Sequence, residues 1–381
     1  MCESGPKLNG DSSITLSKRT IFGAAEQYLN PLIQQIFLAD SINPNFRSKR
    51  SIIRDKKKLV EGVLSGDRTL LSQTITLIES SKAEHRELGE DILEECLDHT
   101  GNSVRIGITG VPGVGKSTFI EALGKLLTDR GRKLAVLTID PSSSRSKGSI
   151  LGDKTRMTEL ASDPNAYIRP SPTGGALGGV ARKTRESMLL CEAAGFDVII
   201  VETVGVGQSE IAVRSMVDFF LLLMLAGAGD ELQGIKRGIM EMADLIAINK
   251  ADEGNKSKAI QARLEYKNAL SLFPPHESGW KPPVVTCSAL HKIGIDELWS
   301  EVEDYFDLVN QNNYFDANRR DQAVYWLYET IDNQLKEQFY RNAKVKKNLP
   351  ELEREVREGE ISSFKAAGKI LNMTDSSESE P

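Results

Sequence analysis

The feature that most constrains this chain is the segment GVPGVGKST at residues 110–118. It follows a short apolar run and opens an amphipathic stretch, so it lies between a predicted strand and a predicted helix. In the matching pattern GxxxxGK[ST], glycines let backbone N–H groups converge on phosphates at a helix N-terminus. Lys116 adds a mobile cation, and Ser117 offers a hydroxyl to Mg²⁺. A glycine turn that merely packs is the alternative, and it does not explain the flanking elements. The predicted phosphate-binding residues are Gly110, Val111, Pro112, Gly113, Val114, Gly115, Lys116, Ser117 and Thr118.

Short apolar runs separated by amphipathic segments continue after this motif. That alternation is typical of βαβ units that cover a buried parallel sheet. The predicted strands are Val104–Thr109, Leu134–Ile139, Val198–Val201, Phe219–Leu225, Leu245–Ile248 and Val284–Thr286. Ligands of such sheets bind at the carboxyl ends of the strands, so the polar residues that end these runs are the candidates for a site.

One of these polar residues is Glu202, which begins ETVG (residues 202–205) at the end of a buried strand. P-loop GTPases usually carry DxxG at this place. The longer glutamate is expected to serve the metal through a bound water or directly, and Gly205 would let the loop close on the γ-phosphate. A helix cap is the plainer interpretation, but a buried strand rarely ends in an unpartnered carboxylate.

The choice of base is predicted from NKAD at residues 249–252. Asp252 can accept both N1–H and the exocyclic amine of guanine, and the stem of Lys250 can cover the ring. CSAL at residues 287–290 follows another strand, where a backbone N–H can reach guanine O6. NKxD alone is weak, but with the P-loop and CSAL it predicts GTP and GDP as ligands. The predicted base-binding residues are Asn249, Lys250, Asp252, Ser288, Ala289 and Leu290.

The chain of 381 residues exceeds one average domain. Helical spacing of apolar residues after Leu59, with Asp67 as a candidate N-cap, and again after Asn312 predicts helical layers on both sides of the sheet domain. The expected fold class is α/β, a P-loop GTPase domain with a mainly parallel sheet and N-terminal and C-terminal helical extensions. The predicted parts are a poorly ordered segment 1–50, a helical region 51–102, the GTPase domain 103–312, a helical region 313–373 and a disordered tail 374–381.

Composition excludes several classes of protein. The longest apolar run, Phe219 to Ala226, is too short to cross a bilayer, and the net charge of −6 argues against a nucleic-acid binder. The basic stretch at residues 47–58 is interpreted as a solvated face. Four scattered cysteines without CxxC spacing indicate a reducing compartment, and the N-terminus resembles no leader sequence, so a cytoplasmic location is expected.

With these residues established, the run from Val104 to about Trp299 resembles the methylmalonyl-CoA mutase-associated GTPases of the MeaB, ArgK and MMAA type. The resemblance rests on six segments: GVPGVGKST, IDPSS, LGDKTRM, YIRPSP, ETVGVGQSE and GDELQGIKRG. It implies a G-protein chaperone of an adenosylcobalamin-dependent mutase, with the C-terminal helices forming a homodimer. It also implies a catalytic set of Lys116, Asp140, Asp153 and Glu202, metal ligands Ser117, Asp140, Asp153 and Glu202, and a third switch with Asp230, Glu231, Gln233 and Lys236.

Two charged, glycine-containing segments, at residues 140–156 and 227–238, would contain these switches, although ordinary surface connections fit their composition as well. Val206 stands where Ras-type GTPases carry the water-orienting glutamine, so slow intrinsic hydrolysis is expected. The chain lacks a cysteine cluster, a histidine tract and a DxHxxG motif, which disfavours nickel or zinc delivery and direct cobalamin binding.

Two other classes stay open at this point. A P-loop small-molecule kinase, the role once attached to ArgK-type names in arginine transport, would need no NKxD. A helical interaction protein that only binds nucleotide would show no Mg²⁺-dependent turnover.

Overall fold

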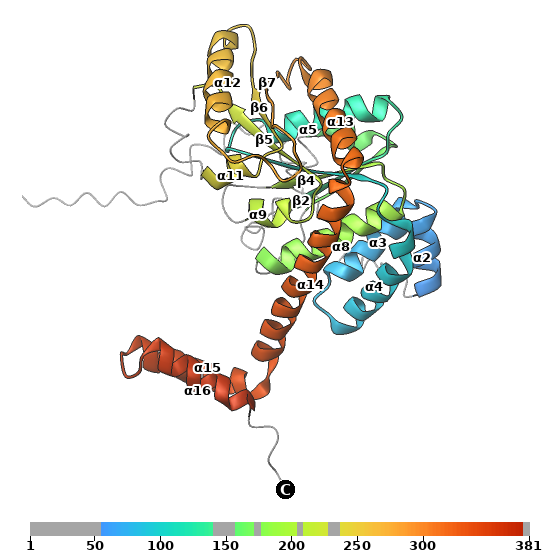
Figure 1. Ribbon diagram of the computed structural model, residues 1–381. Helices are drawn as coiled ribbons and strands as arrows, with labels where there is room; N and C mark the ends of the chain where they lie inside the picture. The colour runs from blue at the N-terminus through green and yellow to red at the C-terminus, as the bar shows by residue number, and fades with distance from the viewer. Residues whose placement is uncertain (1–54, 140–156, 171–176, 204–208, 228–236, 376–381) are drawn as a thin grey trace, which may run out of the picture. The chain divides into compact units, whose positions relative to one another are not determined.

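A computed structural model describes residues 55–139, 157–170, 177–203, 209–227 and 237–375 (Figure 1). All of them belong to one compact unit, residues 53–381. No helix among the described residues is long and apolar enough to cross a membrane.

The centre of the unit is a seven-stranded sheet in which every neighbouring pair of strands is parallel. In the order in which they lie across the sheet, the strands are β3 (Ala166–Arg169), β2 (Leu134–Ile139), β4 (Val198–Thr203), β1 (Val104–Gly110), β5 (Phe219–Leu225), β6 (Leu245–Asn249) and β7 (Val284–Thr286). The predicted α/β class with a parallel sheet is confirmed. Strand β3 was not predicted, because four residues at a sheet edge give too short an apolar run to be recognised.

Helices cover both faces of this sheet. Helix α5 (Lys116–Asp129) packs on β1 and β2, while α8 (Leu177–Ala193) packs on β2 and β4 and α9 (Ser209–Arg214) on β1 and β4. Figure 1 shows α5 and α13 (Ile295–Gln311) on one side and α8 and α9 on the other. Helix α12 (Lys256–Leu270) covers β6 and β7, and two short helices, α7 (Thr158–Ser162) and α11 (Arg237–Glu241), complete this part.

The N-terminal helical layer consists of α2 (Lys56–Leu64), α3 (Arg68–Glu79), α4 (Ala83–Cys96) and a 3₁₀ turn, Leu97–His99. Asp67 is the N-cap of α3, as predicted, and its carboxylate accepts from the N–H groups of Thr69 and Leu70. The layer packs on α8, where Lys183 Nζ donates to Glu79 O at 2.6 Å.

The C-terminal part is helical, as predicted, and consists of α14 (Tyr314–Arg341), α15 (Ala343–Arg357) and α16 (Ser363–Asp375). Helices α15 and α16 pack around Val345, Leu352, Ala366 and Ile370. Four apolar side chains of α14 at helical spacing form a stripe that is 43–58% exposed: Val324, Leu327, Ile331 and Leu335. Phe339, which continues the stripe, packs against the α15–α16 cluster.

Candidate nucleotide site

The predicted phosphate loop lies between β1, which ends at Gly110, and α5, which begins at Lys116. Gly113 and Gly115 have φ angles of +76° and +92°, a region where side chains are strained. A Cβ at Gly110 would lie 2.5 Å from the carbonyl oxygen of Leu223, so this glycine lets β5 approach the loop closely. Gly113 and Gly115 are thus required by their backbone conformation, and Gly110 is required by the close approach of β5.

Lys116 lies over this loop and donates from Nζ to Gly110 O at 2.8 Å. Burial lowers the pKa of Lys116, and the nearby carboxylates of Glu202 and Glu210 act against that shift. Glu202 is 4% exposed and pairs in register with Ile108 of β1. The arrangement holds a partly desolvated ammonium group at the carboxyl edge of the sheet, where it can meet a phosphate group.

The oxygen donors beside the loop fit Mg²⁺. Ser117 is half-buried in the first turn of α5, and Glu202 is the last residue but one of β4, next to the P-loop strand. Thr203 Oγ1 donates to Thr109 Oγ1 at 2.8 Å and ties these two strand ends together. Mg²⁺ is usually held by one or two side chains together with substrate phosphates and waters, so a hydroxyl and a carboxylate suffice. Within the described ranges, no group of three or more His, Cys, Asp or Glu residues could hold a metal without such help.

Asn249 joins the phosphate loop to the predicted base-binding loops. Its buried side chain donates from Nδ2 to Val114 O at 2.9 Å and accepts at Oδ1 from the Ala289 N–H at 3.0 Å. Lys250, with φ of +57°, donates from Nζ to Gly113 O at 2.8 Å. Motifs separated by more than a hundred residues therefore meet at one edge of the sheet.

Asp252 lies at the outer side of this junction. Its Oδ1 accepts a hydrogen bond from Ser288 Oγ, and the neighbouring Ala251 N–H donates to Cys287 O at 3.0 Å. Ser288 and Ala289 are buried, whereas Leu290 is 72% exposed. An oriented, partly exposed carboxylate beside a phosphate loop can read the N1–H and exocyclic amine of guanine.

Some predicted residues lie outside the described part of the chain: Asp140, Asp153, Asp230, Glu231, Gln233 and Lys236. Glu210 was not singled out by the sequence, although it is fully buried on α9 and its charge acts on Lys116. Its place in the ETVGVGQSE segment was the available signal.

A P-loop, an NKAD loop and a CSAL loop at the carboxyl edge of a parallel sheet define the nucleotide site of a P-loop GTPase. The family model described as "Methylmalonyl Co-A mutase-associated GTPase MeaB" matches residues 71–344, more than half of the chain. The chain therefore belongs to this family of GTPases and binds guanine nucleotides.

Individual relatives agree with that assignment. The chain is 52% identical over 320 residues to a probable GTPase of Mycobacterium tuberculosis, covering 83% of this chain and 95% of the relative. It is 44% identical over 324 residues to the "Methylmalonic aciduria type A homolog, mitochondrial" of Mus musculus, covering 82% and 78%. A solved "LAO/AO transport system kinase" is similar with a TM-score of 0.66 and 37% identity, covering 84% of this chain and 98% of that one.

Proposed function

We propose that this GTPase is Mg²⁺-dependent and acts as a chaperone for an adenosylcobalamin-dependent methylmalonyl-CoA mutase, or a related acyl-CoA mutase, gating cofactor loading and protecting the enzyme. The observation that carries the proposal is the extent of the family match. Residues 71–344 include helices of both extensions as well as the nucleotide domain. A generic P-loop domain would match over the nucleotide domain alone.

In this proposal the chain's own residues position the nucleotide. The N–H groups of the phosphate loop and the ammonium of Lys116 hold the phosphates, and Asp252 reads the base. Ser117 and Glu202, with Asp140 and Asp153 as implied by the resemblance, would hold Mg²⁺. The bound metal would neutralise charge that develops on the transferred phosphoryl group.

The alternative is a small-molecule kinase, and the solved relative is named "LAO/AO transport system kinase". The base-reading arrangement of Asn249, Asp252 and Ser288 favours the GTPase, because metabolite kinases need no NKxD reader. The two are separated by following the γ-phosphate of radiolabelled GTP in the presence of arginine. Release as inorganic phosphate supports hydrolysis, and label on the amino acid would contradict it.

The chaperone role is tested by GTP turnover with and without a purified methylmalonyl-CoA mutase. Slow turnover alone and at least about tenfold stimulation by the mutase are expected, because Val206 leaves the chain without the glutamine that orients water in Ras-type enzymes. Alanine at Asp230, Glu231, Gln233 and Lys236 should remove the stimulation and spare the basal rate. Equal GTP turnover with and without the mutase would contradict the chaperone role and would leave the GTPase assignment intact.

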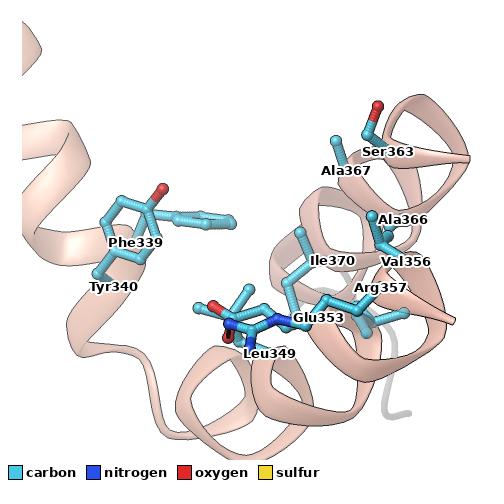
Figure 2. A pocket seen from close by; sticks show the side chains of 11 residues that line it. Phe339, Tyr340, Leu349, Glu353, Val356, Arg357, Ser363, Ala366, Ala367 and Ile370 are labelled. Atoms are coloured by element: carbon cyan, nitrogen blue, oxygen red, sulfur yellow. Dashed lines mark ion pairs between the residues drawn. The ribbon is translucent and has the colours of Figure 1, made fainter. Parts of the chain in front are cut away.

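We also propose that the exposed stripe on α14 is a homodimer contact. It continues at Phe339 into an apolar groove of about 360 Å³ between the end of α14 and the α15–α16 pair, which Figure 2 shows with Leu349, Val356 and Ile370 in its lining. Ile331→Glu with Leu335→Glu should give folded monomers in light scattering. Gln334→Glu with Gln338→Glu adds the same charge at exposed polar positions of α14 and is the matched control. A dimer that persists in the first variant would contradict the contact.

A further inference from the structure

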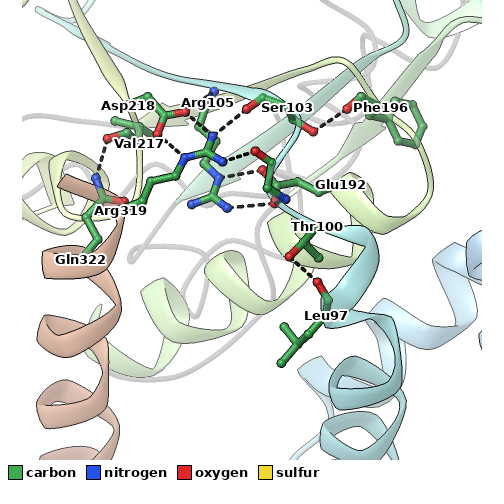
Figure 3. Close-up of polar contacts among 11 residues, drawn as sticks. Leu97, Thr100, Ser103, Arg105, Glu192, Phe196, Val217, Asp218, Arg319 and Gln322 are labelled. Carbon is green, nitrogen blue, oxygen red and sulfur yellow. Dashed lines mark hydrogen bonds and ion pairs between the residues drawn. The ribbon is translucent and has the colours of Figure 1, made fainter. Parts of the chain in front are cut away.

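Three side chains on one face of α14 hold the turn that follows α9. Arg319, Gln322 and Trp326 are spaced i, i+3 and i+7, so they lie on the same side of the helix. Trp326 Nε1 donates to Ser215 O at 2.9 Å, and Gln322 Nε2 donates to Val217 O at 2.8 Å. Figure 3 shows the contact of Gln322 beside that of Arg319.

Arg319 makes the strongest of these contacts. Its Nε and Nη2 atoms donate to the two carboxylate oxygens of Asp218 at 2.8 and 2.7 Å. Paired hydrogen bonds between a guanidinium and a carboxylate fix orientation as well as distance. Asp218 is 1% exposed, so the pair is desolvated. Together the three α14 residues hold nearly every residue of the turn 215–218.

On its other side, this segment presses on the strand that carries the P-loop. A Cβ at Gly107 of β1 would lie 2.7 Å from Val213 Cγ1 and 3.0 Å from Val217 Cγ2. Glycine is required there because α9 and its following turn pack directly on the backbone of β1. Helix α9 therefore packs on the P-loop strand, and the turn that follows it lies between that strand and α14.

Helix α9 packs on β1 and β4, the strands whose carboxyl ends carry Gly110 of the P-loop and Glu202. Glu210 is fully buried, and its negative charge acts on Lys116 together with that of Glu202. Only a few residues separate Glu210 from Ser215, where Trp326 holds the chain. A shift of α14 would thus move a carboxylate whose field is felt by the P-loop lysine.

We propose that Arg319, Gln322 and Trp326 are positioning residues of the GTPase reaction, which hold the segment from α9 to Asp218 against β1, the strand that leads into the P-loop. The inference depends on GTP hydrolysis and not on the mutase. It assigns to α14, which lies outside the nucleotide site, a part in setting the rate of hydrolysis.

The test compares two double variants by steady-state GTP hydrolysis. Gln322→Met with Trp326→Phe removes both hydrogen bonds to backbone carbonyls. Methionine is close in size to glutamine, and phenylalanine keeps an aromatic ring but is smaller than tryptophan. We expect kcat to fall about 5- to 30-fold while KM for GTP stays within about twofold, because one or two hydrogen bonds are lost without a change in the binding groups. Gln334→Met with Tyr328→Phe, at exposed positions of the same helix, should match the wild type.

A spectroscopic readout keeps the inference testable if the first variant folds poorly. Trp280→Phe with Trp299→Phe leaves Trp326 as the single tryptophan of the chain. Its emission should differ between the protein bound to GDP and to a non-hydrolysable GTP analogue. Equal emission in both states, or an unchanged kcat accompanied only by a lower melting temperature, would reduce the three residues to a structural role and overturn the proposal.

Discussion

The two edges of the central sheet use charged residues in opposite ways. At the carboxyl edge, Lys116 and Lys250 donate to carbonyl oxygens of the phosphate loop, and Asp252 accepts from the Ser288 hydroxyl. At the amino edge, charged groups bind one another. A charged group that is hydrogen-bonded to a neutral group can still attract a charged ligand. Two opposite charges that bind each other largely cancel, and their pairing holds structural elements together.

The network of the amino edge is drawn in Figure 3. Arg105 binds Glu192 through two hydrogen bonds of 2.7 and 2.8 Å, and its backbone N–H donates to Asp218 at 2.9 Å. Arg319 binds Asp218 and adds donations to Gly101 O and Ser103 O, both at 2.6 Å. Substitutions at the carboxyl edge should therefore affect turnover most, and substitutions in the charge pairs of the amino edge should affect stability most. The α14 residues that bind this edge are proposed to affect the rate of hydrolysis as well.

The largest effect is expected at Lys116. Replacing Lys116 with Ala removes the cation on the transferred phosphate, and we expect turnover to fall by about 10³-fold or more. Ser117→Ala should have a similar effect through the loss of a Mg²⁺ ligand. Steady-state phosphate release measures both, with Lys258→Ala on the exposed side of α12 as the control. Near-wild-type turnover in either variant would contradict the site.

At the amino edge, Asp218→Ala removes the counter-ion of Arg319 and leaves Arg319 Nε and the Arg105 N–H without their acceptor. Removing one partner of a buried ion pair typically costs about 3–5 kcal/mol of unfolding free energy. Denaturant unfolding followed by circular dichroism measures this loss. Asp321→Ala, an exposed position on the same helix as Arg319, should stay within about 0.5 kcal/mol of the wild type. Equal losses of unfolding free energy in the two variants would contradict a stabilising role for the Asp218 pair at the amino edge.

A smaller, pH-dependent effect distinguishes two carboxylates of α8. Glu192 is bound by two short hydrogen bonds, whereas Glu186 has Arg182 at 3.6 Å. Burial raises the pKa of Glu186 to about 7, and Arg182 opposes the shift. Between about pH 4.5 and 7 the folded protein keeps the Glu186 proton, whereas the unfolded chain has released it. The unfolding free energy therefore falls as the pH rises through this range.

Glu186→Gln should remove this pH dependence. We expect the unfolding free energy of the wild type to fall by up to about 3 kcal/mol more than that of the variant between pH 5 and pH 8. Urea unfolding across that range measures the difference. Parallel pH profiles for the two proteins would show that Glu186 is ionised in the fold throughout.

The sequence predicted the elements whose signals are local. The P-loop, six of the seven strands and the Asp67 cap each depend on residues close together in the chain. It did not predict the amino-edge network, because Arg319 and Asp218 are 101 positions apart and carry no motif. Glu210 was missed for a related reason, since its role depends on where α9 packs against β1.

The most direct test of the account is the base preference of Asp252→Asn, because Asp252 is the residue proposed to recognise guanine at the carboxyl edge of the sheet. Affinities for GTP and xanthosine triphosphate are measured by competition on wild type and variant. The amide offers a donor where xanthine has a carbonyl, so we expect GTP affinity to fall by about 10²-fold or more and xanthosine triphosphate to become the preferred ligand. Unchanged GTP affinity in the variant would contradict the account.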